Sequence, residues 1–490
     1  MAYKHGAYGE ITDSKVTNAA QADVVAAYIG TAPINLIRGY ADANLVNMPI
    51  KVANMSDAQN QLGYAADWEN FTLCEAFAEH FDNIVGNVGP IYVINVLDPD
   101  THKKAETTTT GLQFSNNRAE FKSTDIILDT FAIADKVEDV DYSLSYNFAK
   151  GSVIVKLLKD IEGDTIQCSY NVVDASAVEA ADIIGQTTEN GEYEGLHALK
   201  LVYQNHNAVL NLLAAPGWSH HPEVYTAMVS IVQKLNGHWD GFVNADIPLV
   251  DSTGAGIDTI EKAKEWKENN GYTSEFTKVY WPQVKDSTGR TFHLSTVGQA
   301  TMQRVDLGHD AVPFESPSNK EIMATSQFFG NDAKNKGFDQ HTGNTLNEKG
   351  ITTAVFWGGL WVLWGPHTAA YNYGGDMDAR AIFDVNIRML MHITNGFQLR
   401  HGTRIDEPMT PQDKDTILNI EREQLDTLTG IGALIGSPSV EFVESANPAS
   451  DMMNGDFVWD FSATPTPPFK SGTARVSYTD EGFAAFFEAE

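Results

Sequence analysis

The side chains that could bind a metal are histidines with acids nearby, and their spacing decides whether they could act together. His220 and His221 are adjacent in the sequence. Two histidines that share one metal on a helix are usually four residues apart, so we interpret this pair as polar residues at a helix start. His238 and Asp240 have no third or fourth ligand at metal spacing, and His392 lies on the apolar stripe of a predicted helix. The sequence therefore predicts no metal site.

The acidic side chains with catalytic potential form two close pairs. Glu421 with Glu423, and Asp98 with Asp100, lie among polar residues, which predicts solvated positions. Carboxylates act as general acid and base when a pocket sets their pKa values apart, and nothing in the sequence places either pair in a pocket. The loop-like segment 332–340 fails the EF-hand pattern at its third and fifth positions. We predict neither catalytic carboxylates nor a calcium loop.

Phosphate-binding and nucleophile motifs are also missing from the sequence. No glycine-rich loop ends in GK[ST], and no G-x-S-x-G elbow occurs. Gly254-Ala255-Gly256 has no third glycine, so we interpret it as a turn. Trp357, Trp361 and Trp364 form a local aromatic cluster, for which core packing is favoured over ligand stacking. The sequence predicts no catalytic residue and no cofactor, and it favours a structural or binding protein.

Composition narrows the possible partners. The 490 residues include 33 Lys and Arg against 65 Asp and Glu, which gives a net charge of 33 − 65 = −32. Binding to nucleic acid or to an anionic membrane surface needs clustered basic residues, so we expect neither partner. Cys74 and Cys168 are far apart, which excludes a disulfide framework and favours a reducing compartment. Met1 to Glu10 has no apolar signal region, and no run is long enough to span a membrane.

The elements that must position these residues begin with a predicted β-α-β unit. Asp23 to Pro33 is an apolar run typical of a buried strand, a T-x-x-E capping box at Thr72 predicts a helix, and Ile91 to Leu97 predicts a second, parallel strand. Helices and strands alternate again after residue 193, which predicts a doubly wound α/β core. The expected strands there are 209–215, 239–247, 278–281 and a buried strand region over 353–365, with helices from Pro222 and over 259–270.

Residues 101–192 have a different pattern. Few helical signals occur, and apolar residues alternate with polar ones in three segments. Such alternation is typical of antiparallel strands with one buried face, so we predict an inserted antiparallel β-sandwich. The three predicted strands lie around 142–146, 152–158 and 166–172.

The last third predicts two helices and a terminal arm. Residues 380–396 carry an apolar stripe, and Thr410-Pro411 with Asp413 is typical of a helix start. Ala474, Val476 and Tyr478 alternate with polar residues, which predicts a strand, and aromatic residues follow it. Apolar side chains on such a terminal segment need a cover, so we expect another surface to cover them. The candidate arm residues are Tyr3, Tyr8, Ile11, Val476, Tyr478, Phe483, Phe486 and Phe487.

Several short segments, in order over about residues 20 to 370, resemble the contractile tail sheath proteins of myophages and of phage-tail-like bacteriocins. The C-terminal 120 residues match mainly in pattern, with a helix that carries NIR (386–388), a second helix and closing strands. The matching segments are ADVVAAYIGTAP (22–33), FTLCEAF (71–77), INVLDPDTH (94–102), AAPGWSHHPEV (214–224), DIP (246–248), KVYWP (278–282), SPSNK (316–320) and LWGPHT (363–368).

The resemblance implies a multidomain α/β and α+β protein. Its core would be doubly wound with subtilisin-like topology, would carry the inserted antiparallel β-sandwich, and would be followed by a C-terminal α+β domain that the N-terminal segment completes. The expected boundaries are an N-terminal arm at 1–20, an α/β segment at 21–100, the sandwich at 101–192, the subtilisin-like domain at 193–365, the α+β domain at 366–470 and a C-terminal arm at 471–490.

The resemblance also implies a structural function without enzymatic activity. Copies of the chain would polymerise into a helical tube around an inner tail tube, with baseplate and tail terminator proteins as further partners. Rigid-body rearrangement would contract the tube and drive the inner tube through a cell envelope. The protein would be part of a virion or phage-tail-like particle assembled in a bacterial cytoplasm. Two alternatives are an α/β hydrolase with an accessory β-sandwich binding domain and a surface adhesion module.

Overall fold

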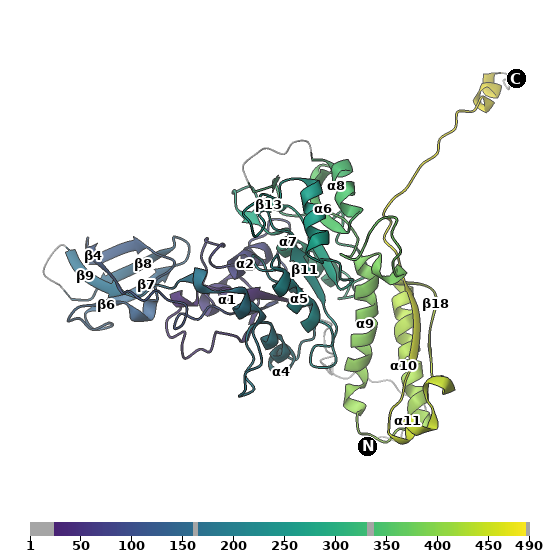
Figure 1. Ribbon diagram of the computed structural model, residues 1–490, viewed down its shortest axis with the longest axis horizontal. Coiled ribbons are helices and arrows are strands. Elements are labelled where there is room, and N and C mark those ends of the chain that lie inside the picture. Colours follow the sequence, from purple (N-terminus) through teal and green to yellow (C-terminus); the bar gives the residue numbers. More distant parts are fainter. Residues whose placement is uncertain (1–23, 160–164, 331–337, 487–490) are drawn as a thin grey trace, which may run out of the picture.

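The computed structural model describes residues 24–159, 165–330 and 338–486. Figure 1 shows an elongated molecule in which a β-rich unit, labelled β4 to β9, lies at one end and the helix pair α9 and α10 at the other. A large sheet with helices lies between them, and the C-terminal segment projects into solvent. The structure thus combines α/β and α+β parts, as predicted. No helix within the described ranges is both long and apolar enough to cross a bilayer.

The central sheet has eight strands in the order β17-β16-β12-β11-β10-β1-β3-β2. All neighbouring pairs from β16 to β3 are parallel, and an antiparallel strand lies at each edge. The parallel pairing of β1 with β3 confirms the predicted β-α-β unit. The strands are β1 (Val25–Gly30), β2 (Pro49–Val52), β3 (Ile91–Asn95), β10 (Leu210–Ala214), β11 (Phe242–Asp246), β12 (Thr277–Tyr280), β16 (Ile351–Trp357) and β17 (Leu360–Trp364).

Helices cover this sheet, and three of them, α2, α5 and α6, begin where the sequence indicates. Helix α6 starts after Thr259, whose side chain accepts the Lys262 N–H, and α5 starts at Pro222. The helix after Thr72 forms, but the predicted capping box does not, because the Thr72 hydroxyl accepts the Thr31 N–H instead. The helices are α1 (Met55–Gln61), α2 (Leu73–Phe81), α3 (Ala180–Ile184), α4 (Leu201–His206), α5 (Pro222–Ile231), α6 (Ile260–Asn269), α7 (Leu294–Leu307) and α8 (Gln340–Asn347).

The predicted buried strand region over 353–365 is a hairpin with an exposed tip. Strands β16 and β17 pair antiparallel across a turn at Gly358 and Gly359, both of which have positive φ angles that glycine adopts without strain. Val355 and Leu363 are buried, whereas Trp357 is 49% exposed. The expectation that the tryptophan cluster is core packing is therefore wrong for Trp357, because this sheet edge extends beyond the helices that cover the centre.

Six strands between residues 108 and 170 form two three-stranded antiparallel sheets, β4-β9-β6 and β5-β8-β7. Their inward side chains share one apolar cluster, which includes Val153, Val155 and Cys168. A third small sheet, β14-β13-β15, lies beside the central sheet. The strands of all three sheets are β4 (Thr108–Gln113), β5 (Arg118–Lys122), β6 (Ala132–Ile133), β7 (Tyr142–Asn147), β8 (Ser152–Leu157), β9 (Thr165–Tyr170), β13 (Gln283–Lys285), β14 (Thr291–Phe292) and β15 (Ser326–Phe328).

The C-terminal part is built from two long helices and a two-stranded sheet. Helices α9 (Asp384–His401) and α10 (Pro411–Gly430) lie side by side in Figure 1, with strands β18 (Leu434–Glu441) and β19 (Asp460–Pro465) against them. A short helix α11 (Ala449–Met453) lies between the strands in the sequence. Two buried ion pairs fix α9 to the α/β part, namely Lys278 with Asp384 on one side and Asp306 with Arg388 on the other.

Candidate assembly interface

The C-terminal arm, residues 471–486, projects away from the described body of the chain (Figure 1). Val476 is 92% exposed and Tyr478 is 86% exposed. The hydrogen bonds of the described arm residues join residues of the arm itself, such as the Phe483 N–H with the Asp480 carbonyl. Residues 474–479 pair with no strand among the described residues, so the predicted strand does not form within one copy. Its pairing with a neighbouring copy stays a prediction.

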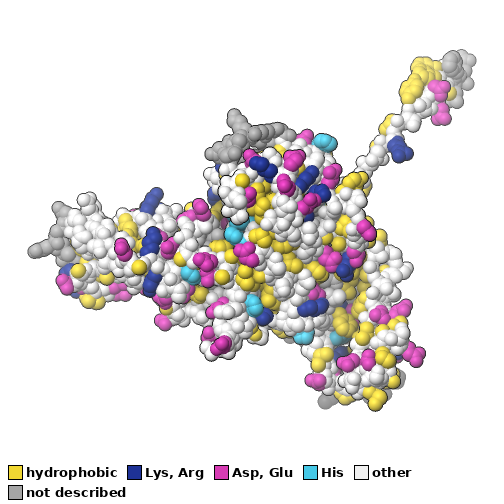
Figure 2. Space-filling view, viewed as in Figure 1, with side chains coloured by type: hydrophobic (Ala, Val, Ile, Leu, Met, Phe, Trp, Pro, Cys, Tyr) yellow, Lys and Arg dark blue, Asp and Glu magenta, His cyan; other side chains and the backbone are white. Residues whose placement is uncertain are grey.

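The arm ends in a short 3-10 helix, η8 (Glu481–Phe486). Phe483 and Phe486 stack on each other with ring centroids 6.2 Å apart, and Phe486 is 79% exposed. Figure 2 shows these apolar side chains as a patch at the tip of the projecting arm, beside acidic side chains. Of the other candidate arm residues, Tyr3, Tyr8, Ile11 and Phe487 lie outside the described residues.

Strands β18 and β19 form a second surface with free hydrogen-bonding groups. Each strand pairs with the other and with no further strand in the described part of the chain, so both outer edges of this sheet are open. Leu434 and Val440 are buried against α9 and α10, whereas Ile435 is 45% exposed. Two-stranded sheets are marginal in water without packing or further strands. The hairpin is therefore a preformed template to which an extended segment can add.

The hairpin is held by the two helices beneath it. Thr410 caps α10 and forms a capping box with Asp413, as predicted. Inside the helix pair, the Glu421 carboxylate accepts hydrogen bonds from Arg400 at 2.9 Å and 2.6 Å and lies 2.6 Å from the His401 ring. The prediction that Glu421 is solvated is wrong, since the residue is 1% exposed. Its contacts with Arg400 and His401 join α10 to α9. These contacts give Glu421 a structural position.

One buried cluster has the residue types of a hydrolase site. His293 Nδ1 lies 2.7 Å from a Glu75 carboxylate oxygen, and Asp246 lies nearby at the end of β11. The Ser295 hydroxyl donates to Asp246, and the Ser219 hydroxyl lies 3.4 Å from the same carboxylate. Sequence analysis missed this cluster because its five residues come from four separate segments.

The geometry of this cluster is that of a helix cap. Glu75 accepts the backbone N–H of His293, and Asp246 accepts the N–H of Ser295, so both carboxylates satisfy free amides in the first turn of α7. Burial would lower the pKa of His293, but the Glu75 carboxylate outweighs it and raises the pKa to about 9. A protonated imidazole cannot accept a proton from a serine, and both serine hydroxyls are directed at Asp246 instead.

The remaining candidate residues occupy structural positions. His221 precedes the first residue of α5 and stacks near His220, whose pKa burial lowers to about 3. Asp240 accepts a hydrogen bond from Lys234, and burial lowers the pKa of His392 to about 4. No group of three or more His, Cys, Asp or Glu side chains within the described ranges could hold a metal ion.

The other sequence features also fit structural positions. Residues 250–256 form a turn closed by the Asp251 carboxylate, as the Gly254-Ala255-Gly256 interpretation expects. Cys74 and Cys168 are free and buried, which agrees with the absence of a disulfide framework. Part of segment 332–340 lies outside the described residues.

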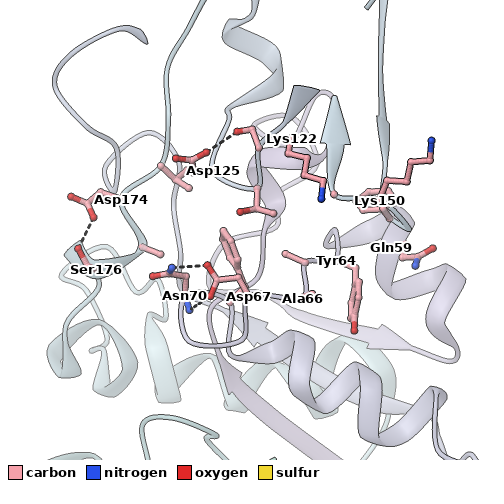
Figure 3. A pocket seen from close by; sticks show the side chains of 18 of the residues that line it. Gln59, Tyr64, Ala66, Asp67, Asn70, Lys122, Asp125, Lys150, Asp174 and Ser176 are labelled. Carbon is pink, nitrogen blue, oxygen red and sulfur yellow. Dashed lines mark hydrogen bonds between the residues drawn. The ribbon is translucent and has the colours of Figure 1, made fainter. Parts of the chain in front are cut away.

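A cavity of about 780 Å³ lies where the β4–β9 unit meets the α/β part (Figure 3). Its labelled lysines, Lys122 and Lys150, lie apart from Asp67, which is bonded to Asn70. Asp125 and Asp174 accept hydrogen bonds from neighbouring serines. The carboxylates are thus engaged locally and do not converge on one point, so the cavity is a crevice between two structural units.

Comparison with curated proteins finds tail sheath proteins. The chain is 24% identical over 475 residues to the tail sheath protein of Burkholderia phage BcepMu, with 92% of each chain covered. It is 25% identical over 347 residues to the tail sheath protein of Escherichia phage P2, which covers 69% of this chain and 78% of that protein. No family model matches the sequence.

Comparison with solved structures finds the same architecture along nearly the whole chain. The structure of the anti-feeding prophage baseplate contains a chain with a TM-score of 0.55 and 14% identity, covering 98% of this chain and 100% of that one. A chain of the PVC extracellular contractile injection system, in its sheath complex in the contracted state, gives a TM-score of 0.53 and 13% identity, covering 98% and 99%. At these identities the likeness shows a common fold.

Sequence relatives and fold neighbours agree with each other and with the inactive geometry of the His293 cluster. They favour the sheath interpretation over the hydrolase and adhesion alternatives. They confirm the predicted resemblance: over most of its length the chain is similar to contractile tail sheath proteins, which are structural components of phage tails.

Proposed function

We propose that copies of this chain polymerise into a helical, contractile sheath and that the C-terminal arm links neighbouring copies. The observation that carries the proposal is the arm itself, in which Val476 and Tyr478 are about nine-tenths exposed on a segment that projects away from the described body of the chain. Exposed apolar residues on an extended chain end are an aggregation hazard unless another surface covers them. In a closed or helical array, the same arm meets the same neighbour surface in every copy.

The β18–β19 hairpin of a neighbouring copy is the acceptor we propose for residues 474–479. Its open edges offer unpaired N–H and C=O groups, and its inner face is already packed on α9 and α10. A strand of ~5 residues adds about five backbone hydrogen bonds worth ~0.5–1.5 kcal/mol net each. Burial of Val476 and Tyr478 adds ~1.5–3 kcal/mol for each side chain. Each link is moderate, and repetition through the array makes the assembly strong.

The finer architecture follows the same proposal. We assign the eight-stranded sheet with its helices to a doubly wound domain of subtilisin-like topology over 21–100 and 193–365. The two facing sheets over 101–192 would be an inserted β-sandwich, supported by their shared apolar cluster. Residues 366–470 would be the α+β domain, completed by the N-terminal segment, with arms at 1–20 and 471–490.

Contraction in this proposal is a change of packing between rigid bodies. The paired strands stay joined while the α/β domains of neighbouring copies rotate into new contacts. The sheath would surround an inner tail tube and connect to baseplate and tail terminator proteins in a virion or tail-like particle assembled in a bacterial cytoplasm. The structural neighbours include the sheath complex of one injection system and the baseplate of another, which supports the self-association and baseplate steps.

Deletion of residues 471–490 tests the proposal. The described arm residues contribute no packing to the body, so the truncated chain should fold with an unchanged melting temperature. It should form no tubes in negative-stain microscopy under conditions in which the full chain does. Normal tubes from the truncated chain would contradict arm linkage, whereas loss of folding would show that the arm has an internal role.

A further inference from the structure

A groove of about 1420 Å³ lies between helices α4 and α5 and the C-terminal end of α9. Its lining includes apolar side chains that are exposed in the single copy. Tyr203 is 37% exposed, Leu399 is 51% exposed and Ile405 is 73% exposed. Their surfaces remain in contact with water unless another molecule covers them, so the groove is suited to an occupant with apolar side chains.

The charge of the groove is opposite to that of the chain as a whole. The described residues that line it include no Asp or Glu, although the chain has a net charge of −32. Lys234 is paired with Asp240, which lies outside the lining. Lys200 lies over the Tyr193 ring at 5.2 Å and 3.5 Å from His197 Nδ1, so its ammonium group faces the groove rather than a carboxylate. The groove therefore favours an acidic occupant.

The tip of the C-terminal arm has the complementary composition. Residues 480–490 contain four acids, Asp480, Glu481, Glu488 and Glu490, and no Lys or Arg. Phe483 and Phe486 form a stacked apolar face in the same segment. A short acidic segment with an aromatic face matches a groove whose described lining has exposed apolar side chains and Lys200, and no acidic residue.

The positions of the groove and the arm favour a second copy as the donor. The arm leaves its own body near Tyr371, whose ring lies 5.8 Å from Lys470 Nζ, and it runs outward from there (Figure 1). The groove lies at the other end of α9, a helix of 18 residues that is about 27 Å long at 1.5 Å per residue. At that end Phe397 lines the groove and also contacts Phe461 of β19. A neighbour's strand paired with the hairpin could thus continue directly into the groove.

We propose that the arm tip of one copy, residues 480–486, docks into the groove between α4, α5 and α9 of a neighbouring copy. The proposal rests on the proposed function, because it extends the arm link from a paired strand to a second anchor. The stacked Phe483 and Phe486 cover the exposed apolar side chains of the groove, and Glu481 approaches Lys200. The strand supplies hydrogen bonds, and the tip supplies the contact that selects one partner surface.

Disulfide trapping between two full-length variants tests the contact. Gly482→Cys places a thiol on the arm tip and Gly402→Cys places one in the groove, at glycines where an added Cβ meets open space. The native cysteines are buried and do not interfere. Differently tagged preparations are mixed, oxidised and assayed for a disulfide between the two tags. Gly256→Cys, another open position away from the groove, is the matched control.

We expect a disulfide between copies for Gly402→Cys and none for the control. Phe483→Ala with Phe486→Ala should lower its initial rate at least about tenfold, since two buried aromatic contacts are lost. Lys200→Glu should lower it about threefold, and adding Glu481→Lys should restore it. Salt at 1 M should reduce the effect of Lys200→Glu on this rate, because it screens the attraction between Lys200 and Glu481.

Tube formation by the same variants separates this inference from the proposed function. Tubes without the inter-copy disulfide would overturn docking in the groove while leaving strand addition in place. A disulfide within one copy would overturn the second copy as donor. A disulfide between copies with no tubes in any preparation would support the docking and contradict the sheath proposal.

Discussion

The central sheet and the C-terminal hairpin differ in how many of their strands are paired on both sides. Strand β1 lies between two parallel partners, and all six of its residues are buried. Strands β18 and β19 each have one partner among the described residues, and most of their side chains are exposed or half-buried. Buried peptide groups in native proteins are almost always paired. The interior strands of the sheet are thus paired on both sides within one copy, whereas each strand of the hairpin has an edge to which, in our proposal, another chain adds.

Charged side chains repeat the contrast. Lys278 and Asp384 are fully buried and pair at 2.6 Å, so each satisfies the other inside the molecule. The described arm acids, Asp480 and Glu481, are exposed near the Phe483 and Phe486 rings and form no ion pair among the described residues. The comparison therefore predicts two classes of variant: changes in the core should alter stability with little direct effect on subunit contacts, and changes in the arm should do the reverse.

The largest expected effect is on assembly, from Val476→Asp combined with Tyr478→Asp. Two buried charges in an added strand cost more than the strand contributes, so tube formation should be abolished. The melting temperature of the subunit should stay within about 1 °C, because both side chains are exposed in the single copy. Sedimentation and negative-stain microscopy measure assembly, and differential scanning calorimetry measures stability.

The control for this pair is Arg475→Ala with Ser477→Ala, which changes the alternate face of the same segment. We expect tubes from the control. A fall in melting temperature for the Asp variant, or equal loss of tubes from both, would break the comparison between a self-sufficient core and an open arm.

The second effect is on stability, from Lys278→Met. Removal of one partner leaves the Asp384 carboxylate buried without its cation, which destabilises by about 3–5 kcal/mol. Lys278→Met with Asp384→Leu should recover most of this loss, because no isolated charge remains. Urea unfolding of the two variants measures the difference. Equal destabilisation by both would mean that packing, and not the buried charge, governs this site.

The third effect is a pH dependence at the cap of α7. The pKa of His293 is raised from its ordinary value to about 9 beside Glu75. The folded state therefore holds a proton that the unfolded state releases near pH 6.5, so this stabilisation is complete below pH 6.5 and is lost as the pH rises through 9. The loss is on the order of 3 kcal/mol, from about 1.4 kcal/mol for each unit of pKa shift.

His293→Asn isolates this contribution. Glu79, whose pKa burial raises to about 8, titrates in the same range and also favours the folded state at lower pH. Both proteins should therefore lose stability with rising pH, and the wild type should lose more. Parallel urea midpoints from pH 6 to 9.5 would show that the Glu75 contact is not the source of the dependence.

The sequence predicted the buried strands of the central sheet better than the helix α7 that packs on it. Apolar runs gave β1, β3 and β10 with ends within three residues, because strands buried on both faces are apolar throughout. Helix α7 was missed, since polar residues are buried along it together with apolar ones: Gln299 donates to the Ala27 carbonyl and Gln303 to the Val24 carbonyl. A helix whose buried positions mix polar and apolar residues has no clear apolar stripe to detect.

Exposure was the other property that the sequence could not give. Glu421 stands among polar residues in the sequence, yet it is buried because Arg400 and His401 approach from a different helix. Trp357 stands in an apolar run, yet it is half exposed because the β16–β17 hairpin passes the edge of the core. Both outcomes depend on which elements pack together. The groove beside α9 was missed for the same reason, since its lining comes from distant segments.

The smallest expected effect sharpens the comparison within the C-terminal part. The Thr410 hydroxyl accepts the Asp413 N–H, and the Asp413 carboxylate accepts the Thr410 N–H. The pair thus satisfies two backbone amides at the start of α10. Thr410→Ala should destabilise the chain by about 1 kcal/mol, whereas Thr410→Ser should be nearly neutral. Because α10 supports the hairpin from within the copy, both variants should still form tubes. Loss of tubes from Thr410→Ala at unchanged folding would contradict this expectation. It would mean that subunit contacts depend on how α10 supports β18, and not only on the open edges of the hairpin.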